Sequence, residues 1–164
     1  MQRQIHPIPP FFDRHSKILI LGSFPSVASR ESGFYYGHPQ NRFWKLLASL
    51  FDTPAPSTME EKKDLLGAHH LALWDVIGAC EIRGSSDSSI QKSVPNPLTR
   101  IFNHCDIQRI FTNGKTADHL FDKYNANIRI PKDCLPSSSP ANASYSFEKL
   151  RETWKLIRDV SIQD

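Results

Sequence analysis

Short apolar runs alternate along this chain of 164 residues with longer segments in which apolar residues recur every three or four positions. The short runs predict buried strands, and the periodic segments predict amphipathic helices. Four runs, each followed by Gly, Asp, Asn or Pro-Ser, are expected to be strands: residues 17–21, 70–74, 109–112, and either 128–130 or 134–135. Strands that alternate with helices are typical of a mostly parallel sheet, so we expect one α/β domain over residues 1–164.

Four helices are expected from apolar stripes and end signals. One begins near Asn41, and a second starts at a capping box formed by Thr58 and Glu61. A third, short helix begins with Asn96 as its N-cap before a proline. The fourth is the clearest and lies near the end of the chain. The apolar face of the first helix consists of Phe43, Leu46, Leu47 and Leu50. The apolar face of the last helix consists of Phe147, Leu150, Trp154 and Ile157.

The strand at 17–21 runs into a tight loop at 22–26, and an aromatic segment with a lone amide follows at 34–44. A buried parallel strand delivers its following loop to the carboxyl edge of the sheet, where open α/β folds bind their ligands. We therefore expect the chemistry of this protein at that edge.

Composition narrows the class of protein. The formal charge of +3 and the pI near 8.8 are compatible with a local phosphate-facing patch but do not establish one. Cys80, Cys105 and Cys134 are widely spaced, and no metal-ligand spacing of histidines is present, so we expect neither a disulfide framework nor a metal or other cofactor. No signal-peptide core or membrane-length apolar run occurs. The sequence therefore favours a cytoplasmic monomer without a membrane partner.

Two familiar motifs are incomplete. Gly114-Lys115-Thr116 resembles the end of a phosphate-binding P-loop, but the first glycine of that motif would fall at Arg109. A serine hydrolase needs G-x-S-x-G at a strand-to-helix turn, and the loop at 22–26 does not match it. Neither activity is expected.

Asn41 and Tyr36 each allow two interpretations. Asn41 is well placed to cap the following helix, and a neutral amide near a strand end also suits the orientation of a water molecule. Tyr36 lies in a glycine-flanked aromatic loop, which either packs on the sheet as a lid or provides a stacking platform for a flipped base. The pattern alone leaves both choices open.

Two further segments are candidates. Asp75 follows a strand and is either a turn or helix-capping residue or a carboxylate at the binding edge. The serine-rich segment at 136–142 is either a polar loop or a phosphate-binding loop, because hydroxyl and backbone N–H groups before a helix suit a phosphate.

Four blocks together resemble the uracil-DNA glycosylase superfamily, and specifically its hypoxanthine (deoxyinosine) DNA glycosylase branch. Their order and spacing carry the resemblance over most of the chain. The blocks are Gly22-Ser23-Phe24-Pro25-Ser26, Tyr35-Tyr36-x-x-Pro39-x-Asn41-x-Phe43-Trp44, Leu73-Trp74-Asp75-Val76 with the segment 84–90, and Ser137-Ser138-Ser139-Pro140-Ala141-Asn142.

The resemblance implies a three-layer α/β/α sandwich around a four-stranded parallel sheet, with the base pocket at the carboxyl ends of the strands. Many relatives carry Asp or Asn two residues after the glycine of the first motif, where this chain has Phe24. The catalytic role therefore falls to Asn41 by resemblance. The second motif lacks the histidine or asparagine that precedes its proline in the uracil enzymes, and Ala141 and Asn142 replace the expected apolar wedge. Efficient release of uracil is accordingly not implied.

The predicted function is hydrolysis of the N-glycosidic bond of a deaminated base, hypoxanthine preferred, in single- or double-stranded DNA. Base contacts are assigned to Ser23, Phe24, Tyr36 and Asp75, and DNA contacts to Ser137, Ser138, Ser139 and Asn142. No lysine in these motifs is placed to form a Schiff base, so we expect no strand cleavage. Two alternatives stay open: an enzyme that acts mainly on uracil or xanthine, and a non-catalytic DNA-binding module of the same fold.

Overall fold

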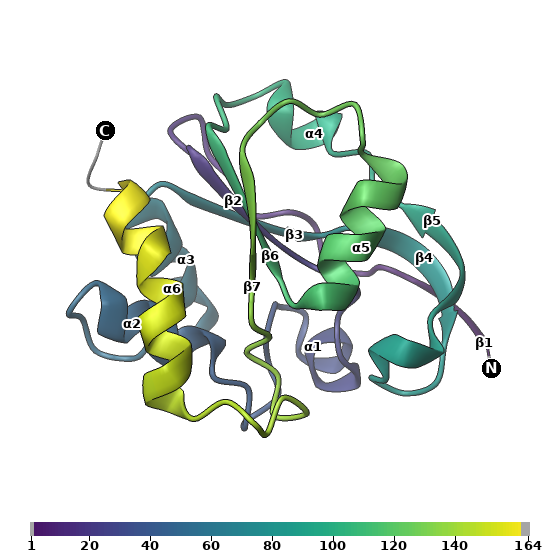
Figure 1. The fold of residues 1–164 in the computed structure, drawn as a ribbon, viewed down its shortest axis with the longest axis horizontal. Coiled ribbons are helices and arrows are strands. Elements are labelled where there is room, and N and C mark those ends of the chain that lie inside the picture. The colour runs from purple at the N-terminus through teal and green to yellow at the C-terminus, as the bar shows by residue number, and fades with distance from the viewer. Residues whose placement is uncertain (1, 162–164) are drawn as a thin grey trace.

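A computed structural model describes residues 2–161 and contains the four expected strands (Figure 1). They form a parallel sheet in the order β3-β2-β6-β7. For the fourth strand the second of the two predicted positions is correct. The strands are β2 (Ile18–Gly22), β3 (Leu71–Asp75), β6 (Arg109–Asn113) and β7 (Lys132–Leu135).

The register of this sheet brings the ends of its strands to one edge. All five residues of β2 are buried, as expected for a central strand covered on both faces. Gly22 pairs with Asp75, and Leu21 lies between Trp74 and Thr112. The residues that end β2, β3 and β6 therefore lie side by side at the carboxyl edge.

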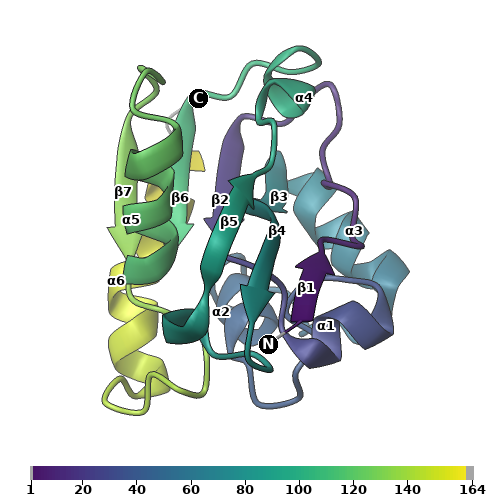
Figure 2. The same cartoon turned by 90° about the vertical axis from the view of Figure 1, so that its right-hand side faces the viewer.

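Helices cover both faces of the sheet, which confirms the predicted layered α/β fold. Figure 2 shows α2 (Phe43–Leu50), α3 (Met59–Ala68) and α6 (Phe147–Ser161) behind the sheet, and α5 (Lys115–Tyr124) in front of it. The capping box of Thr58 and Glu61 is present at the start of α3. The predicted stripe of α6 is also confirmed, because Leu150, Trp154 and Ile157 are buried.

A second, antiparallel sheet was not predicted. It has the order β1-β4-β5 and lies in front of the parallel sheet (Figure 2). Its strands are β1 (Gln2–Ile5), β4 (Ile77–Ile82) and β5 (Gln91–Pro95). The two outer strands are largely exposed and polar, so they lack the apolar alternation that reveals a half-buried strand. Residues 83–90, which include the short 3₁₀ helix Asp87–Ser89, connect β4 to β5.

Two short helices also correct the sequence prediction. α1 (Val27–Ser32) was missed, although Ser26 caps it by accepting a hydrogen bond from the N–H of Ser29. α4 (Thr99–Phe102) begins later than predicted, and Asn96 does not cap it. The amide of Asn96 instead donates to the backbone carbonyls of Asp75 and Ile77, because β4 turns away from β3 there. Over residues 2–161, no helix is both long and apolar enough to cross a membrane.

Candidate active site

Polar side chains from distant parts of the chain meet at the carboxyl edge of the parallel sheet. Asp75 and Asn113 end β3 and β6, and Ser138 lies in the loop after β7. Asn41 lies just before α2 and is linked to Ser138 by a hydrogen bond across 97 residues of sequence. The edge therefore holds a connected polar network where an open α/β fold binds its ligand.

The amide of Asn41 is held in one orientation. Its Oδ1 accepts a hydrogen bond from the backbone N–H of Phe43 at 3.0 Å and another from the Ser138 hydroxyl at 2.8 Å. A backbone N–H can only donate, so the oxygen of the amide must face it. Among the described residues no acceptor lies within hydrogen-bond distance of Nδ2. Asn41 therefore stabilises the start of α2 and also presents a free NH₂ group.

The hydroxyl of Ser138 links Asn41 to Asn113. Ser138 is fully buried, its hydroxyl accepts from Nδ2 of Asn113 at 3.0 Å, and its backbone N–H donates to Oδ1 of Asn113 at 3.0 Å. This two-point contact fixes the serine, which in turn donates to Asn41. The sequence prediction placed Ser138 in a DNA-contacting loop, whereas the structure places its side chain beneath that loop.

Tyr36 stacks on Phe43 with ring centroids 4.0 Å apart and planes inclined by 19°. Its φ of 53° is unusual for a residue other than glycine, and strain of this kind concentrates at functional sites. The neighbouring Phe34 and Tyr35 are buried in the core, so for them the packing interpretation is correct. Tyr36 is the aromatic of this segment that reaches the carboxyl edge.

The hydroxyl of Tyr36 is buried without a hydrogen-bond partner among the described residues. Burial, and next the negative charge of Asp75, raise the pKa of Tyr36 far above its usual value, so the hydroxyl stays protonated. A buried unpaired hydroxyl costs roughly 1–3 kcal/mol. Such a cost within the polar network marks this group as one with unmet bonding capacity.

Asp75 lies against Gly22, where only glycine fits. A Cβ on Gly22 would lie 2.4 Å from Oδ1 of Asp75 and 3.1 Å from the Tyr36 hydroxyl. The other carboxylate oxygen, Oδ2, is 2.7 Å from Nε2 of His6. Within the described part of the chain, no donor contacts Oδ1. The carboxylate therefore keeps one oxygen available at the edge.

His6 contacts Asp75 through one ring nitrogen, Nε2. Its Nδ1 accepts the backbone N–H of Ile8 at 3.2 Å, so this nitrogen carries no proton and Nε2 must be the donor to Asp75. The His6 side chain is 3% exposed, and the Asp75 side chain is 4% exposed. No local pattern in the sequence pointed to this pair, because 69 residues separate its members.

The loop after β2 contributes backbone groups more than side chains. Ser23 is buried, and its hydroxyl donates to Asp87 at 2.7 Å. Phe24 is 7% exposed and packs edge-on against His6 at 5.7 Å between ring centroids. The N–H groups of Ser23 and Phe24 have no hydrogen-bond acceptor in the described residues. These two donors are therefore free at the edge.

The loop at 137–145 is ordered by its own hydrogen bonds. The hydroxyl of Ser137 accepts from the N–H of Ser139, and the hydroxyl of Ser139 accepts from the N–H of Ala141. The amide of Asn142 donates to the carbonyl of Ser137 at 3.0 Å. The side chains proposed to contact DNA therefore shape the loop, and their contact with DNA stays a prediction.

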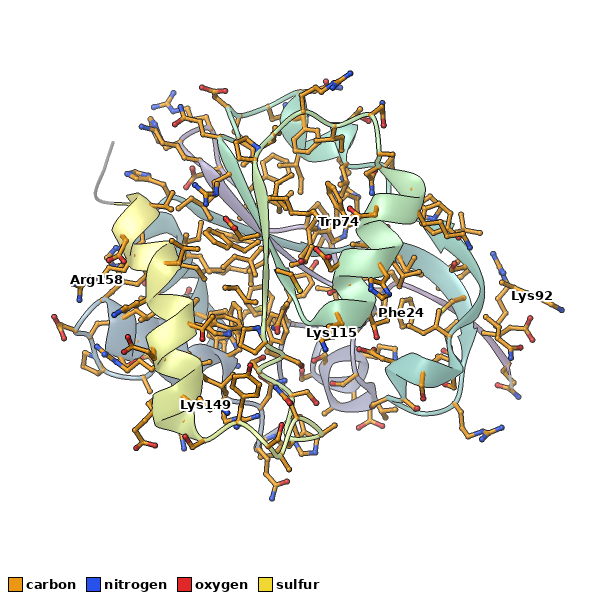
Figure 3. All side chains as sticks on the ribbon, in the orientation of Figure 1. Phe24, Trp74, Lys92, Lys115, Lys149 and Arg158 are labelled. Carbon is orange, nitrogen blue, oxygen red and sulfur yellow. The ribbon has the colours of Figure 1, made fainter. Side chains whose placement is uncertain are left out.

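Some lysine side chains of this protein are paired with carboxylates, and others are not. Lys132 is paired with Asp118 and Asp122, and Lys92 is paired with Glu81. Figure 3 shows Lys115 and Lys149 at the lower side of the molecule, where α5 and α6 begin. Positive charge that is not matched by a carboxylate therefore lies near the carboxyl edge.

One cavity lies away from this edge, and another borders it. One of about 410 Å³ is lined by residues at the amino edge of the sheet, including His69, His70 and Arg158. The other, of about 250 Å³, lies beside β3 and is lined in part by His6, which contacts Asp75, and by Trp74 and Asn96. In residues 2–161 no group of three or more His, Cys, Asp or Glu side chains is arranged to hold a metal ion.

Comparison with known proteins identifies the family. The family model described as "Uracil DNA glycosylase superfamily" matches residues 9–160, nearly the whole chain. The chain belongs to this superfamily. The uracil DNA glycosylase fold is also found in a solved relative: a proposed uracil DNA glycosylase from Methanosarcina acetivorans, solved by NMR, aligns with a TM-score of 0.78 and 28% identity over 94% of this chain and 99% of that one.

Curated relatives agree with this assignment to the uracil DNA glycosylase superfamily. The chain is 33% identical over 148 residues to a hypoxanthine DNA glycosylase of Methanosarcina barkeri, covering 89% of this chain and 92% of the relative. It is 26% identical to a G/U mismatch-specific uracil DNA glycosylase of Schizosaccharomyces pombe, covering 93% of this chain and 53% of that protein. The protein is therefore a DNA glycosylase, an enzyme that hydrolyses N-glycosyl bonds, and DNA is its partner.

Proposed function

We propose that this DNA glycosylase releases deaminated bases, with hypoxanthine preferred, and that it works as a monomer that does not cleave the strand. The observation that carries the proposal is the fixed amide of Asn41 beside the stacked ring of Tyr36, with one carboxylate oxygen of Asp75 unpaired nearby. A free NH₂ group, an aromatic face and a hydrogen-bond acceptor are the three groups that such a reaction uses.

Asn41 is proposed to orient the attacking water. Because Oδ1 already accepts two hydrogen bonds, the amide acts through Nδ2, which donates to the oxygen of the water. Breaking a glycosidic bond gives the sugar a cationic character, so the water needs correct placement more than it needs deprotonation. A neutral amide supplies that placement, and poor placement by about 1 Å can cost on the order of 100-fold in rate.

The departing base is proposed to be stabilised by the loop after β2. Negative charge grows on the base as the bond breaks, and the free N–H groups of Ser23 and Phe24 can stabilise it by donating hydrogen bonds to the base. A preorganised donor of this kind contributes about 3–4 kcal/mol in other enzymes. Tyr36 is proposed to stack on the flipped base.

Asp75 is proposed to select the base. Its Oδ1 would accept the N1–H of hypoxanthine, while a backbone N–H meets O6. Adenine presents an acceptor at N1 and a donor at N6, so both protein groups would stay unpaired. A mismatch of this kind can favour the correct base over the wrong one by up to ~10⁴-fold. Uracil presents a similar edge through N3–H and O4, so release of uracil is the alternative that the yeast relative's name favours.

The test is single-turnover base release from duplexes that carry deoxyinosine, deoxyuridine or deoxyxanthosine. We expect the fastest release from deoxyinosine and a loss of about 100-fold or more in Asn41→Ala. Thr58→Ala is the matched control, because it also removes a side chain that caps a helix, but it does so in α3. Parental rates in Asn41→Ala would remove the catalytic assignment, and the fastest release from deoxyuridine would move the preference to uracil.

Asn41→Asp distinguishes the two ends of the amide. Aspartate keeps an oxygen acceptor for the N–H of Phe43 and the hydroxyl of Ser138, but it has no NH₂ group. If the amide acts through Nδ2, this variant is as slow as Asn41→Ala while its folded structure is retained. A rate near the parental value would mean that an oxygen of the side chain orients the water.

A further inference from the structure

Arg42 follows the proposed catalytic amide and makes the densest set of contacts with the loop at 137–145. Its guanidinium donates to the backbone carbonyls of that loop, and its backbone N–H donates to the carbonyl of Ser138 at 3.1 Å. The four carbonyl acceptors of the guanidinium belong to Ser138, Ser139, Asn142 and Tyr145, with distances of 2.8 Å for Ser139 and 3.1 Å for Asn142.

The contacts suit arginine and no other side chain. A guanidinium carries five N–H donors in a rigid plane, so it can reach several carbonyls that point inward from a curved loop. A lysine has three donors at one point and cannot span such a set. Among the described residues no carboxylate pairs with Arg42, and its guanidinium donates to backbone carbonyl oxygens instead. A half-buried cation solvated in this way fixes the backbone that solvates it.

Two hydrogen bonds connect Ser138 of the loop at 137–145 to the segment that carries Asn41. Arg42 holds the carbonyl of Ser138, and the hydroxyl of the same serine donates to Oδ1 of Asn41 at 2.8 Å. If the loop moves, the serine hydroxyl moves with it, and Asn41 loses one of the two bonds that set its orientation. The geometry therefore connects a residue that faces the loop to the group proposed to hold the water.

We propose that Arg42 is a positioning residue: it locks the loop at 137–145 against the start of α2, so that Ser138 holds the amide of Asn41 in its reactive orientation. The expected effect on the rate of base release rests on the proposed function. The locking of the loop is a separate physical property and can be measured without any substrate.

The experiment combines a double-mutant cycle with hydrogen exchange. Single-turnover base release from a deoxyinosine duplex, at saturating enzyme, is measured for Arg42→Ala, Ser138→Ala and the double variant. Amide hydrogen exchange of residues 138–146 is measured in the same proteins. Arg151→Ala is the matched control, since Arg151 is a half-buried arginine that donates to the hydroxyl and carbonyl of Ser49 between α6 and α2.

We expect Arg42→Ala to lower the maximal rate by about 10-fold or more and the double variant to be no slower than the slower single variant, because both changes remove the same support. Arg42→Lys is expected to recover part of the rate. Exchange in the loop should rise in Arg42→Ala but not in Arg151→Ala, which should keep the parental rate within about twofold.

Three results would overturn the inference: losses that multiply in the double variant, an equal loss of rate in Arg151→Ala, or unchanged loop exchange in Arg42→Ala. If Arg42→Ala does not fold, the same double-mutant cycle is measured with Arg42→Lys in its place, combined with Ser138→Ala. A parent protein that releases no base from any duplex would defeat the proposed function, whereas an active parent with an unaffected Arg42→Ala defeats only the positioning role.

Discussion

The two edges of the parallel sheet differ in what they offer a ligand. The amino edge has a cavity of about 410 Å³, and one of the side chains that line it, His69, is stacked on Phe51 with ring centroids 3.8 Å apart. At the carboxyl edge Asp75 and Tyr36 each keep a polar atom that has no partner within residues 2–161. We therefore place the proposed site by the unmet bonding capacity of converging groups and not by the volume of a cavity.

Glycines near each edge test this contrast most strongly. Gly22→Ala would place a Cβ 2.4 Å from the Asp75 carboxylate, so we expect the free energy of unfolding to fall by about 2–3 kcal/mol and base release to be lost. At Gly67 in α3 the nearest atom to a new Cβ is Oδ2 of Asp13 at 3.7 Å. Gly67→Ala should therefore add about 0.5–1 kcal/mol of stability and keep the parental activity.

Urea unfolding and base release, measured on both glycine variants, check this pair. Equal stability changes in the two variants would mean that the carboxyl edge is no more tightly constrained than the helix.

Asp75→Asn sharpens the comparison by changing one atom at the carboxyl edge. The amide oxygen can still accept from His6, but an NH₂ group replaces the unpaired oxygen and faces the N1–H of hypoxanthine. We expect release of hypoxanthine to fall by about 10–100-fold, since a donor then meets a donor, with a smaller change in stability. Single-turnover rates and thermal unfolding measure both. Unchanged rates would reduce Asp75 to a structural partner of His6.

Tyr36→Phe removes the unpaired hydroxyl and keeps the ring that stacks on Phe43. Removing a buried group that has no partner should raise the free energy of unfolding by about 1 kcal/mol. If Tyr36 works by stacking, base release should stay within about threefold of the parent. A loss of 10-fold or more, measured on the deoxyinosine duplex, would instead show that the hydroxyl contacts the base.

Asp87→Asn tests the smallest effect, which depends on pH. Burial raises the pKa of Asp87, the hydrogen bond from Ser23 opposes the rise, and the charge of Asp75 adds to it. Between its ordinary value of about 3.9 and the raised pKa, the folded protein binds more protons than the unfolded chain. Stability therefore falls as the pH rises through this window, and Asp87→Asn lacks that fall.

Urea midpoints for the parent and Asp87→Asn between about pH 3 and pH 7 check this, because the difference between the two curves isolates one carboxyl. Parallel curves would mean that the pKa of Asp87 does not change on folding.

The layered fold was predictable because its signals are local. The run that forms β2 is continuously apolar, and the stripe of α6 repeats at helical spacing. The antiparallel sheet was not, because β1 and β5 are polar edge strands whose partner is defined only in space. Asn96 was misassigned for the same reason: its cap-like sequence context is overridden by carbonyls of β3 and β4.

The sequence by itself determined the four strands of the parallel sheet, the helices α2, α3 and α6, and the edge at which chemistry was expected. The spacing of apolar residues dictates local structure, and a parallel strand fixes where its loop emerges. Only the tertiary structure decided how the site is held. His6 contacts Asp75 across 69 residues, and Arg42 contacts Ser139 across 97. Such contacts follow from how buried polar groups satisfy one another after the chain has packed, and no local pattern encodes them.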